Sequence, residues 1–261
     1  SIFGPTDVVA RGEDPELLHD LAFDGSLADG EGDATIVYQT SDVVFVADST
    51  GGNALALTLA PTPDAVRVRE SSTQAYAVEY ELSGTGGGYA FAFWFEPQGG
   101  PLNFVDAVTL VLSTTEVAIR TFSDEEPVVY APAASRLARL GLSFGLDEQD
   151  RSIVGLGLSI DYPGGEYYGS VPATADDAPF HVVISSDDRG ATAVYVNGER
   201  VLSQTSPLAH PRGPATYATI ALGLEEYVGG AGSFSRIHQA QLYSEGMTAA
   251  EVRELYSEGP E

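Results

Sequence analysis

The sequence contains no lysine and no cysteine. Its 12 Lys and Arg residues are all arginine, and they stand against 38 Asp and Glu residues, so the formal net charge is -26. Without cysteine the chain forms no disulfide and performs no thiol chemistry. Because proteins bind phosphate groups through clustered Lys and Arg, the composition excludes nucleic acids and anionic membrane surfaces as partners.

Long apolar runs are also missing. No apolar run reaches the roughly 18 residues that a membrane-spanning helix needs, and residues 1–12 lack the charged and apolar regions of a signal peptide. We therefore expect no segment that inserts into a membrane.

The acidic excess indicates a protein adapted to very high salt. Like charges repel and destabilise a compact chain at low ionic strength, but at 1 M salt the Debye length is only about 3 Å, so exposed charges are screened. The absence of lysine favours a halophilic protein over the alternative, an ordinary acidic protein from a GC-rich mesophile.

Short runs rich in Val, Ile, Tyr and Phe recur along the chain between clusters of Gly, Pro, Asp and Ser, a pattern typical of β-strands. The clearest alternation covers residues 75–82 and 89–95, and Asn197-Gly198 is a strong hairpin signal. So many strands do not fit one open sheet and predict two packed layers. We expect residues 1–13 to form an N-terminal arm and residues 14–261 one domain, with a long insertion of loops or an extra hairpin at about residues 97–178.

Helical signals are few. Thr248 and Glu251 match a capping box, which predicts a short helix over residues 249–257 near the C-terminus. A second helical turn is expected near residues 14–19, where Pro15 suits a first helical position.

Four segments resemble, in order, laminin-G-like domains of the concanavalin A-like lectin and glucanase superfamily. They are LAFDGSLADG at 21–30, AFAFWFEP at 90–97, FHVVIS at 180–185 with AVYVNG at 193–198, and FSRIHQAQLY at 234–243 with MTAAEVRELY at 247–256. The resemblance implies an all-β, two-sheet antiparallel jelly-roll sandwich with a short C-terminal helix, in a superfamily dominated by carbohydrate binding and adhesion. The chain departs from the family at His238-Gln239, where Asp-Glu is usual, and at Phe180, where Trp is common.

The sequence predicts no catalytic activity. Glycosidases need two carboxylates facing one cleft, and the Glu-x-Asp-x-x-Glu strand motif of the superfamily's glucanases does not occur. Glu79 and Glu81 share a strand face, and we interpret that face as solvated. The four histidines are scattered and no Gly-x-Ser-x-Gly motif accompanies them.

A calcium site is the one cofactor that the sequence suggests. Asp24, Asp29 and Asp33 follow the first predicted strand among glycine turns, and carboxylate oxygens at such spacing suit Ca²⁺. The alternative is that a chain with 38 acidic residues forms such clusters by chance.

The candidate ligand-binding residues are tyrosines beside carboxylates. Tyr162, Tyr167 and Tyr168 flank Glu166 around a Pro-Gly-Gly turn, and Tyr227 follows two further glutamates. Tyrosine stacks on a sugar ring while carboxylates accept from its hydroxyls. The alternative is that these tyrosines cover the core.

These features favour a non-catalytic, lectin-like binding or adhesion module exposed on a halophilic cell surface or a virion, as a capsid decoration, turret or tail-fibre protein. Its partner would be a glycan or a surface glycoprotein. The alternative is a structural virion or surface-assembly subunit that binds neighbouring subunits or copies of itself, through the N-terminal arm, and no glycan. A glycoside hydrolase of the same fold is the third hypothesis.

Overall fold

The chain is described from a computed structural model. The described residues are 14–23, 25–26, 30–31, 35–39, 45–47, 52–57, 76–81, 88–97, 104–113, 118–121, 127–130, 136–146, 153–162, 165–171, 179–187, 191–205, 217–222 and 235–260. The predicted N-terminal arm, residues 1–13, lies outside them.

In the described part of the chain, eight strands form the first sheet, and every pairing is antiparallel. The order is β15-β14-β13-β6-β17-β4-β3, with β1 also paired to β17. The strands are β1 (Leu17–Leu21), β3 (Phe45–Ala47), β4 (Asn53–Leu57), β6 (Tyr89–Pro97), β13 (Phe180–Ser186), β14 (Ala191–Val196), β15 (Glu199–Thr205) and β17 (Ser235–Tyr243).

Seven strands form the second sheet, also antiparallel, in the order β12-β11-β10-β7-β16-β5-β2. They are β2 (Thr35–Gln39), β5 (Tyr76–Glu81), β7 (Phe104–Ser113), β10 (Arg136–Leu146), β11 (Ile153–Tyr162), β12 (Gly165–Val171) and β16 (Tyr217–Leu222). A separate hairpin joins β8 (Ala118–Thr121) to β9 (Pro127–Tyr130).

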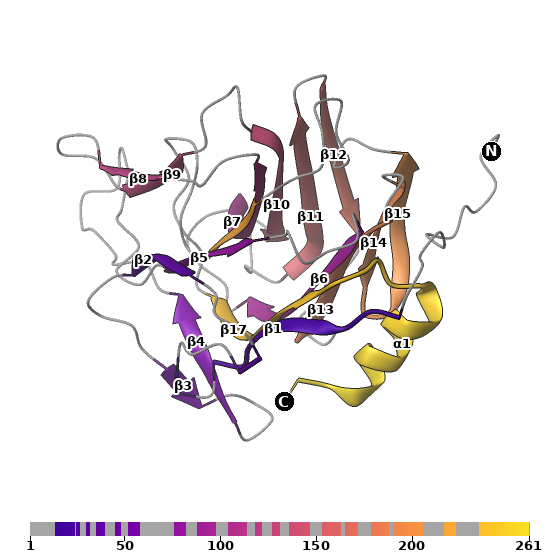
Figure 1. Ribbon diagram of the computed structural model, residues 1–261, viewed down its shortest axis with the longest axis horizontal. Coiled ribbons are helices and arrows are strands. Elements are labelled where there is room, and N and C mark those ends of the chain that lie inside the picture. The colour runs from indigo at the N-terminus through magenta and orange to yellow at the C-terminus, as the bar shows by residue number, and fades with distance from the viewer. Residues whose placement is uncertain are drawn as a thin grey trace.

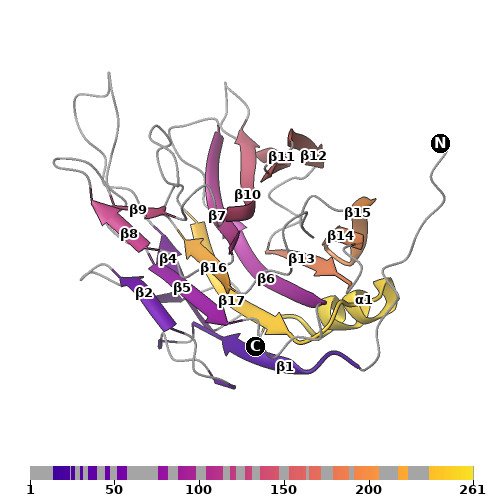
Figure 2. The same cartoon turned by 45° about the horizontal axis from the view of Figure 1, so that its top comes forward.

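The chain folds into layers. The single described helix, α1 (Ala249–Glu258), lies on one side of the first sheet, and the second sheet lies on the other (Figures 1 and 2). Phe91 and Phe93 of β6 are fully buried, as are Val182 and Ile184, which pair with them from β13. The alternate residues Ala90 and Ala92 pack toward α1 instead, in a cluster with Val183, Tyr195 and Val252.

This architecture confirms the predicted fold class, an antiparallel β-sandwich with one short C-terminal helix. Residues 97–178, expected to be an insertion of loops or an extra hairpin, supply much of the second sheet instead. The stretch contains an extra hairpin, β8–β9, but it also supplies β7, β10, β11 and β12, which are four of the seven strands of the second sheet.

The expected helical turn at residues 14–19 is also wrong, since residues 17–21 form strand β1. Pro15 suits an extended chain as well as a first helical position. The open edge of β17 favours a strand here, because among the described residues β4 pairs with no more of β17 than Ser235, Arg236 and Ile237. Strand β1 hydrogen-bonds to the remainder of that edge, with Leu21 opposite Ala240.

Helix α1 begins where the capping box predicts. The Thr248 hydroxyl accepts from the Glu251 backbone NH at 3.4 Å, and the Glu251 carboxylate accepts from the Thr248 backbone NH at 2.8 Å. Val252 is the buried residue of the helix. Within the described residues, no helix is long and apolar enough to cross a membrane.

The β14–β15 hairpin turns at Asn197-Gly198, as predicted, with positive φ angles of 49° and 77°. This turn packs against α1. A Cβ atom on Gly198 would lie 3.2 Å from Tyr256 Cδ1 and 3.3 Å from Arg253 Cγ, so a side chain there meets both the strain of positive φ and the helix.

We expect Gly198→Ala to lower the free energy of unfolding by about 1 to 2 kcal/mol, measured by urea denaturation in molar salt. Gly259→Ala is the control, because Gly259 also has positive φ (79°) but nothing lies within 4 Å of its Cβ position. If both variants lost the same free energy of unfolding, the contact between the Gly198 turn and α1 would contribute nothing to the effect of Gly198→Ala.

Candidate functional site

Three of the four predicted tyrosines lie in two paired strands, β11 and β12, at one edge of the second sheet. Tyr162 ends β11, and Glu166, Tyr167 and Tyr168 belong to β12, which is the last strand of that sheet in the described chain. These residues thus belong to two paired strands, and residues 163–164 between the strands are outside the described residues. Ladder pairing continues up to Tyr162 and Gly165.

The strand register divides these residues between the two faces of the sheet. In β11 the apolar positions Leu156, Leu158 and Ile160 alternate with Gly157, Ser159 and Asp161. Directly paired residues of an antiparallel sheet share a face. The apolar positions pair with Phe144, Leu142 and Leu140 of β10, whereas the small and polar positions pair with Ser143, Gly141 and Arg139. The second sheet thus has one apolar face and one polar face.

The three β12 residues do not share a face. Tyr167 pairs with Ile160 on the apolar face. Glu166 and Tyr168 pair with Asp161 and Ser159, so they belong to the polar face. By the register, Tyr167 therefore belongs to the apolar face of the second sheet and Tyr168 to the polar face.

Two unbroken rows cross the polar face from β12 to β2. The charged row consists of Glu166, Asp161, Arg139, Val111, Thr219, Glu79 and Thr35. The tyrosine row consists of Tyr168, Ser159, Gly141, Thr109, Ala221, Ala77 and Tyr38. Because neighbouring strands are about 4.8 Å apart, each row is on the order of 29 Å long.

The tyrosine row combines a floor of small residues with an aromatic residue at each end. Small residues leave room above a sheet for a ligand, and Tyr offers a ring for stacking and a hydroxyl for hydrogen bonding. The neighbouring charged row supplies carboxylates and one guanidinium, which suit the hydroxyl groups of a sugar. Glu79 belongs to this row through its pairing with Thr219, and its solvation stays a prediction.

Sequence reasoning missed Tyr38 and Arg139 as site residues. Nothing near either residue in the sequence marks it, and each joins the site only through pairing with strands that are distant along the chain. Tyr38 reaches the tyrosine row through Ala77 after a bulge in β2, and Arg139 lies between Asp161 and Val111.

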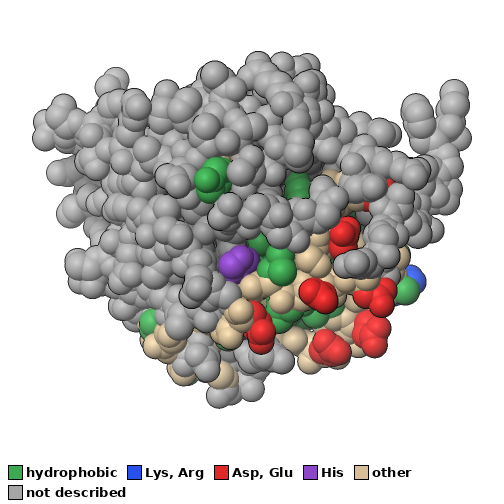
Figure 3. Space-filling model, in the orientation of Figure 1, with side chains coloured by type: hydrophobic (Ala, Val, Ile, Leu, Met, Phe, Trp, Pro, Cys, Tyr) green, Lys and Arg blue, Asp and Glu red, His purple; other side chains and the backbone are tan. Residues whose placement is uncertain are grey.

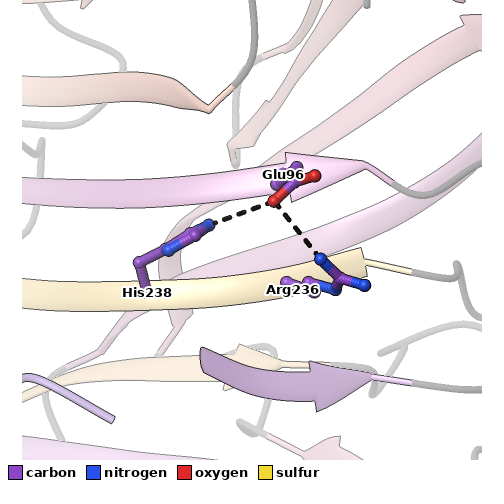
Figure 4. Close-up of polar contacts among 3 residues, drawn as sticks. All are labelled: Glu96, Arg236 and His238. Carbon is purple, nitrogen blue, oxygen red and sulfur yellow. Dashed lines mark ion pairs between the residues drawn. The ribbon is translucent and has the colours of Figure 1, made fainter. Parts of the chain in front are cut away.

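A polar cluster occupies the first sheet, at the split between β1 and β4 along β17. Glu96 of β6 lies 3.5 Å from His238 Nε2 and 3.8 Å from Arg236 NH1, measured from its Oε2 atom (Figure 4). The ladder shifts register between Ile237 and Gln239, at His238. Gln239 Nε2 donates to Asp20 Oδ1 at 2.9 Å. These contacts pair the polar groups with one another, and we interpret the cluster as structural.

The calcium residues Asp24, Asp29 and Asp33 lie outside the described residues, as does Tyr227. Among the residues that are described, no group of three or more His, Cys, Asp or Glu side chains is arranged to hold a metal ion.

The comparisons place the chain by its fold. No family model matches the sequence, and no curated protein matches it. Among solved structures, domain 4 of AbnA, a GH43 extracellular arabinanase from Geobacillus stearothermophilus in complex with arabinotriose, is 16% identical with a TM-score of 0.53, over 94% of this chain and 100% of that one. The binding domain of Paraclostridial Mosquitocidal Protein 1 is 15% identical with a TM-score of 0.57, over 93% of this chain and 52% of that one.

The binding domain of botulinum neurotoxin DC, in complex with rat synaptotagmin II, is 10% identical with a TM-score of 0.54, over 93% of this chain and 51% of that one. This chain therefore spans about half the length of the toxin domains and the whole of the arabinanase domain. At these identities the likeness shows the fold alone: the chain has the β-sandwich fold of domains that bind carbohydrates and receptors.

Proposed function

We propose that the chain is a non-catalytic carbohydrate-binding module, and that its glycan lies along the tyrosine row on the polar face of the second sheet. The observation that carries this proposal is the register, which aligns Tyr168, five small residues and Tyr38 in one row beside a charged row. An outer face built only to be solvated needs no such ordering of residue types.

The residues of the two rows would make two kinds of contact with the glycan, stacking contacts and hydrogen bonds. Tyr168 and Tyr38 supply stacking surfaces near the two ends of an extended glycan. Glu166, Asp161 and Glu79 supply acceptors for sugar hydroxyls, and Arg139 supplies donors. A row of about 29 Å suits a chain of several sugar rings more than a single ring, so affinity should rise with glycan length.

The comparisons support a glycan ligand. The arabinanase domain was solved in complex with arabinotriose, and cell entry of botulinum neurotoxin type C depends on interaction with two ganglioside molecules. Both share the fold of this chain. The same fold serves protein receptors, as the synaptotagmin complex shows for the neurotoxin domain.

We propose further that the module acts outside the cell in high salt, on a halophilic cell surface or a virion. The net charge of -26 and the absence of lysine support that setting. Asp24, Asp29 and Asp33 remain the proposed calcium ligands.

The test is glycan binding in 2 to 3 M NaCl, by glycan array and by calorimetry with arabino-oligosaccharides of increasing length. We expect Tyr168→Ala to weaken binding by about tenfold or more, on the order of 1.4 kcal/mol, with the fold intact. Glu166→Gln should weaken it less, since it keeps the shape and removes only the charge.

Tyr167→Ala is the matched control in the same strand. Because Tyr167 is assigned to the apolar face, its loss should lower the free energy of unfolding and leave the dissociation constant unchanged. The opposite result, with Tyr167 deciding affinity and Tyr168 deciding stability, would invert the assignment of faces. Absence of binding to any glycan, together with self-assembly in solution, would replace the proposal with the structural-subunit hypothesis.

A further inference from the structure

Three aromatic rings stack where α1 covers the first sheet. The His181 ring on β13 lies 4.5 Å from the Trp94 ring on β6, centroid to centroid, with an interplanar angle of 25°. The Tyr256 ring on α1 lies 5.7 Å from Trp94 and 6.0 Å from His181, at 17° and 15°. His181 and Trp94 are buried, while Tyr256 is 37% exposed. Tyr256 is thus the outer ring between the other two and the solvent.

Two hydrogen bonds to Asn197 fix the backbone of His181. Its NH donates to Asn197 Oδ1 at 2.9 Å, and its carbonyl accepts from the Asn197 NH at 2.8 Å. The imidazole has no such partners, because neither Nδ1 nor Nε2 makes a hydrogen bond within the described structure, and Trp94 Nε1 makes none either. A buried polar group without a partner costs about 1 to 3 kcal/mol, and a charge there costs more.

Among the described residues, no charged side chain is paired with the imidazole of His181. The acidic and basic side chains on the surrounding elements are Glu96 on β6, Arg236 and His238 on β17, Glu199 and Arg200 on the β14–β15 hairpin, and Glu251, Arg253, Glu254 and Glu258 on α1; the tyrosines there are Tyr89, Tyr195, Tyr243 and Tyr256. Glu96 lies on the same strand as Trp94, but its carboxylate is paired with His238 and Arg236 and not with His181. Protonated His181 would therefore have no counter-ion.

We propose that His181 is an acid-sensitive latch that releases helix α1 from the first sheet when its imidazole becomes protonated. A charged imidazole needs water, and one of the elements covering it must move to admit water. Strand β13 is fixed by two ladders, to β6 and to β14. The helix is held by a smaller set of contacts, chiefly Val252, the Tyr256 stack and the Ser185 hydroxyl at Met247. The helix is thus the element that yields.

The sign of the pH dependence follows from burial. Desolvation lowers the pKa of His181 from 6.5 to about 4, so protonation favours the open state. The docked helix has its full stability above pH 6.5 and loses it as the pH falls toward 4. A pKa difference of about 2.5 corresponds to a change of about 300-fold in the docking equilibrium across that window.

The test uses the emission of Trp94, the single tryptophan of the chain, in 3 M NaCl from pH 8 to pH 3.5. We expect a red shift as the pH falls between 6.5 and 4. His181→Phe keeps a ring in the stack and should abolish this transition. His238→Gln is the matched control, because His238 is a second buried histidine, on strand β17 at the other side of β6, and this variant should retain the transition. An unchanged transition in His181→Phe, or its loss in His238→Gln, would overturn the proposal.

Hydrogen exchange separates helix release from unfolding of the whole chain. With exchange corrected for its intrinsic pH dependence, residues 249–258 should lose protection at acid pH while residues 180–186 keep theirs. Equal loss in both segments would refute the latch. Tyr256→Ala should expose Trp94 already at pH 8, and a buried Trp94 emission in that variant would count against the helix as the cover, whether or not His181→Phe folds.

Discussion

Removing salt should unfold the chain. At 10 mM NaCl we expect the strand signal in circular dichroism to be lost, and in 3 M NaCl we expect it to persist, because the Debye length falls from about 30 Å to below about 3 Å between these conditions. The exposed charged residues that are described are mostly acidic, namely Asp14, Glu16, Glu31, Glu199, Glu254 and Glu258 against Arg253. Figure 3 shows acidic side chains gathered over β1 and α1.

The control for this experiment is an uncharged osmolyte. Sucrose stabilises folded proteins without screening charge, so it should not restore the fold at low ionic strength. Melting temperatures that are equal at 10 mM and 3 M NaCl would remove the argument for a high-salt habitat and leave the ordinary acidic protein as the explanation of the composition.

Phe93→Ala should lower the free energy of unfolding by about 3 to 5 kcal/mol. Phe93 is fully buried between Val182 and Ala240 on the neighbouring strands, and its ring stacks on Phe91 with centroids 6.2 Å apart and an interplanar angle of 6°. This loss would be a large fraction of the total stability of a domain, which is about 5 to 15 kcal/mol.

Urea denaturation in 3 M NaCl measures this loss, since guanidinium would change the ionic strength together with the denaturant. Phe93→Leu keeps most of the apolar volume and should cost much less. A loss below about 1 kcal/mol for Phe93→Ala would show that this face of β6 does not form the core between the two sheets.

Features set by a few adjacent residues could be predicted from the sequence. The capping box of Thr248 and Glu251 and the turn at Asn197-Gly198 depend only on local backbone preferences, and both form as expected. The alternation of Tyr89 to Phe95 also identified β6 correctly. These signals established the fold class, because a sandwich follows from many short alternating strands.

Features set by pairing between distant segments could not be predicted. The tyrosine row depends on which strand lies beside which, and on bulges that shift the register, such as the one between Ile36 and Tyr38. Pro163 and Gly164 stand in the sequence between two strands that pair with each other, β11 and β12, and these strands include Tyr162 and Tyr168. A strand at residues 17–21 was missed because its cause is the open edge of β17, which lies at the other end of the chain.

The central claim is that a glycan lies along the tyrosine row of the second sheet, and amide chemical-shift mapping tests it most directly. In a titration of ¹⁵N-labelled protein in molar salt with the arabino-oligosaccharide that binds best, the largest shifts should follow β12, β11 and β10 around Tyr168, Ser159 and Gly141. The amides of α1 and β13 should not move. Shifts confined to α1, β13 and β6, with β10 to β12 unchanged, would place the ligand on the first sheet and contradict the account.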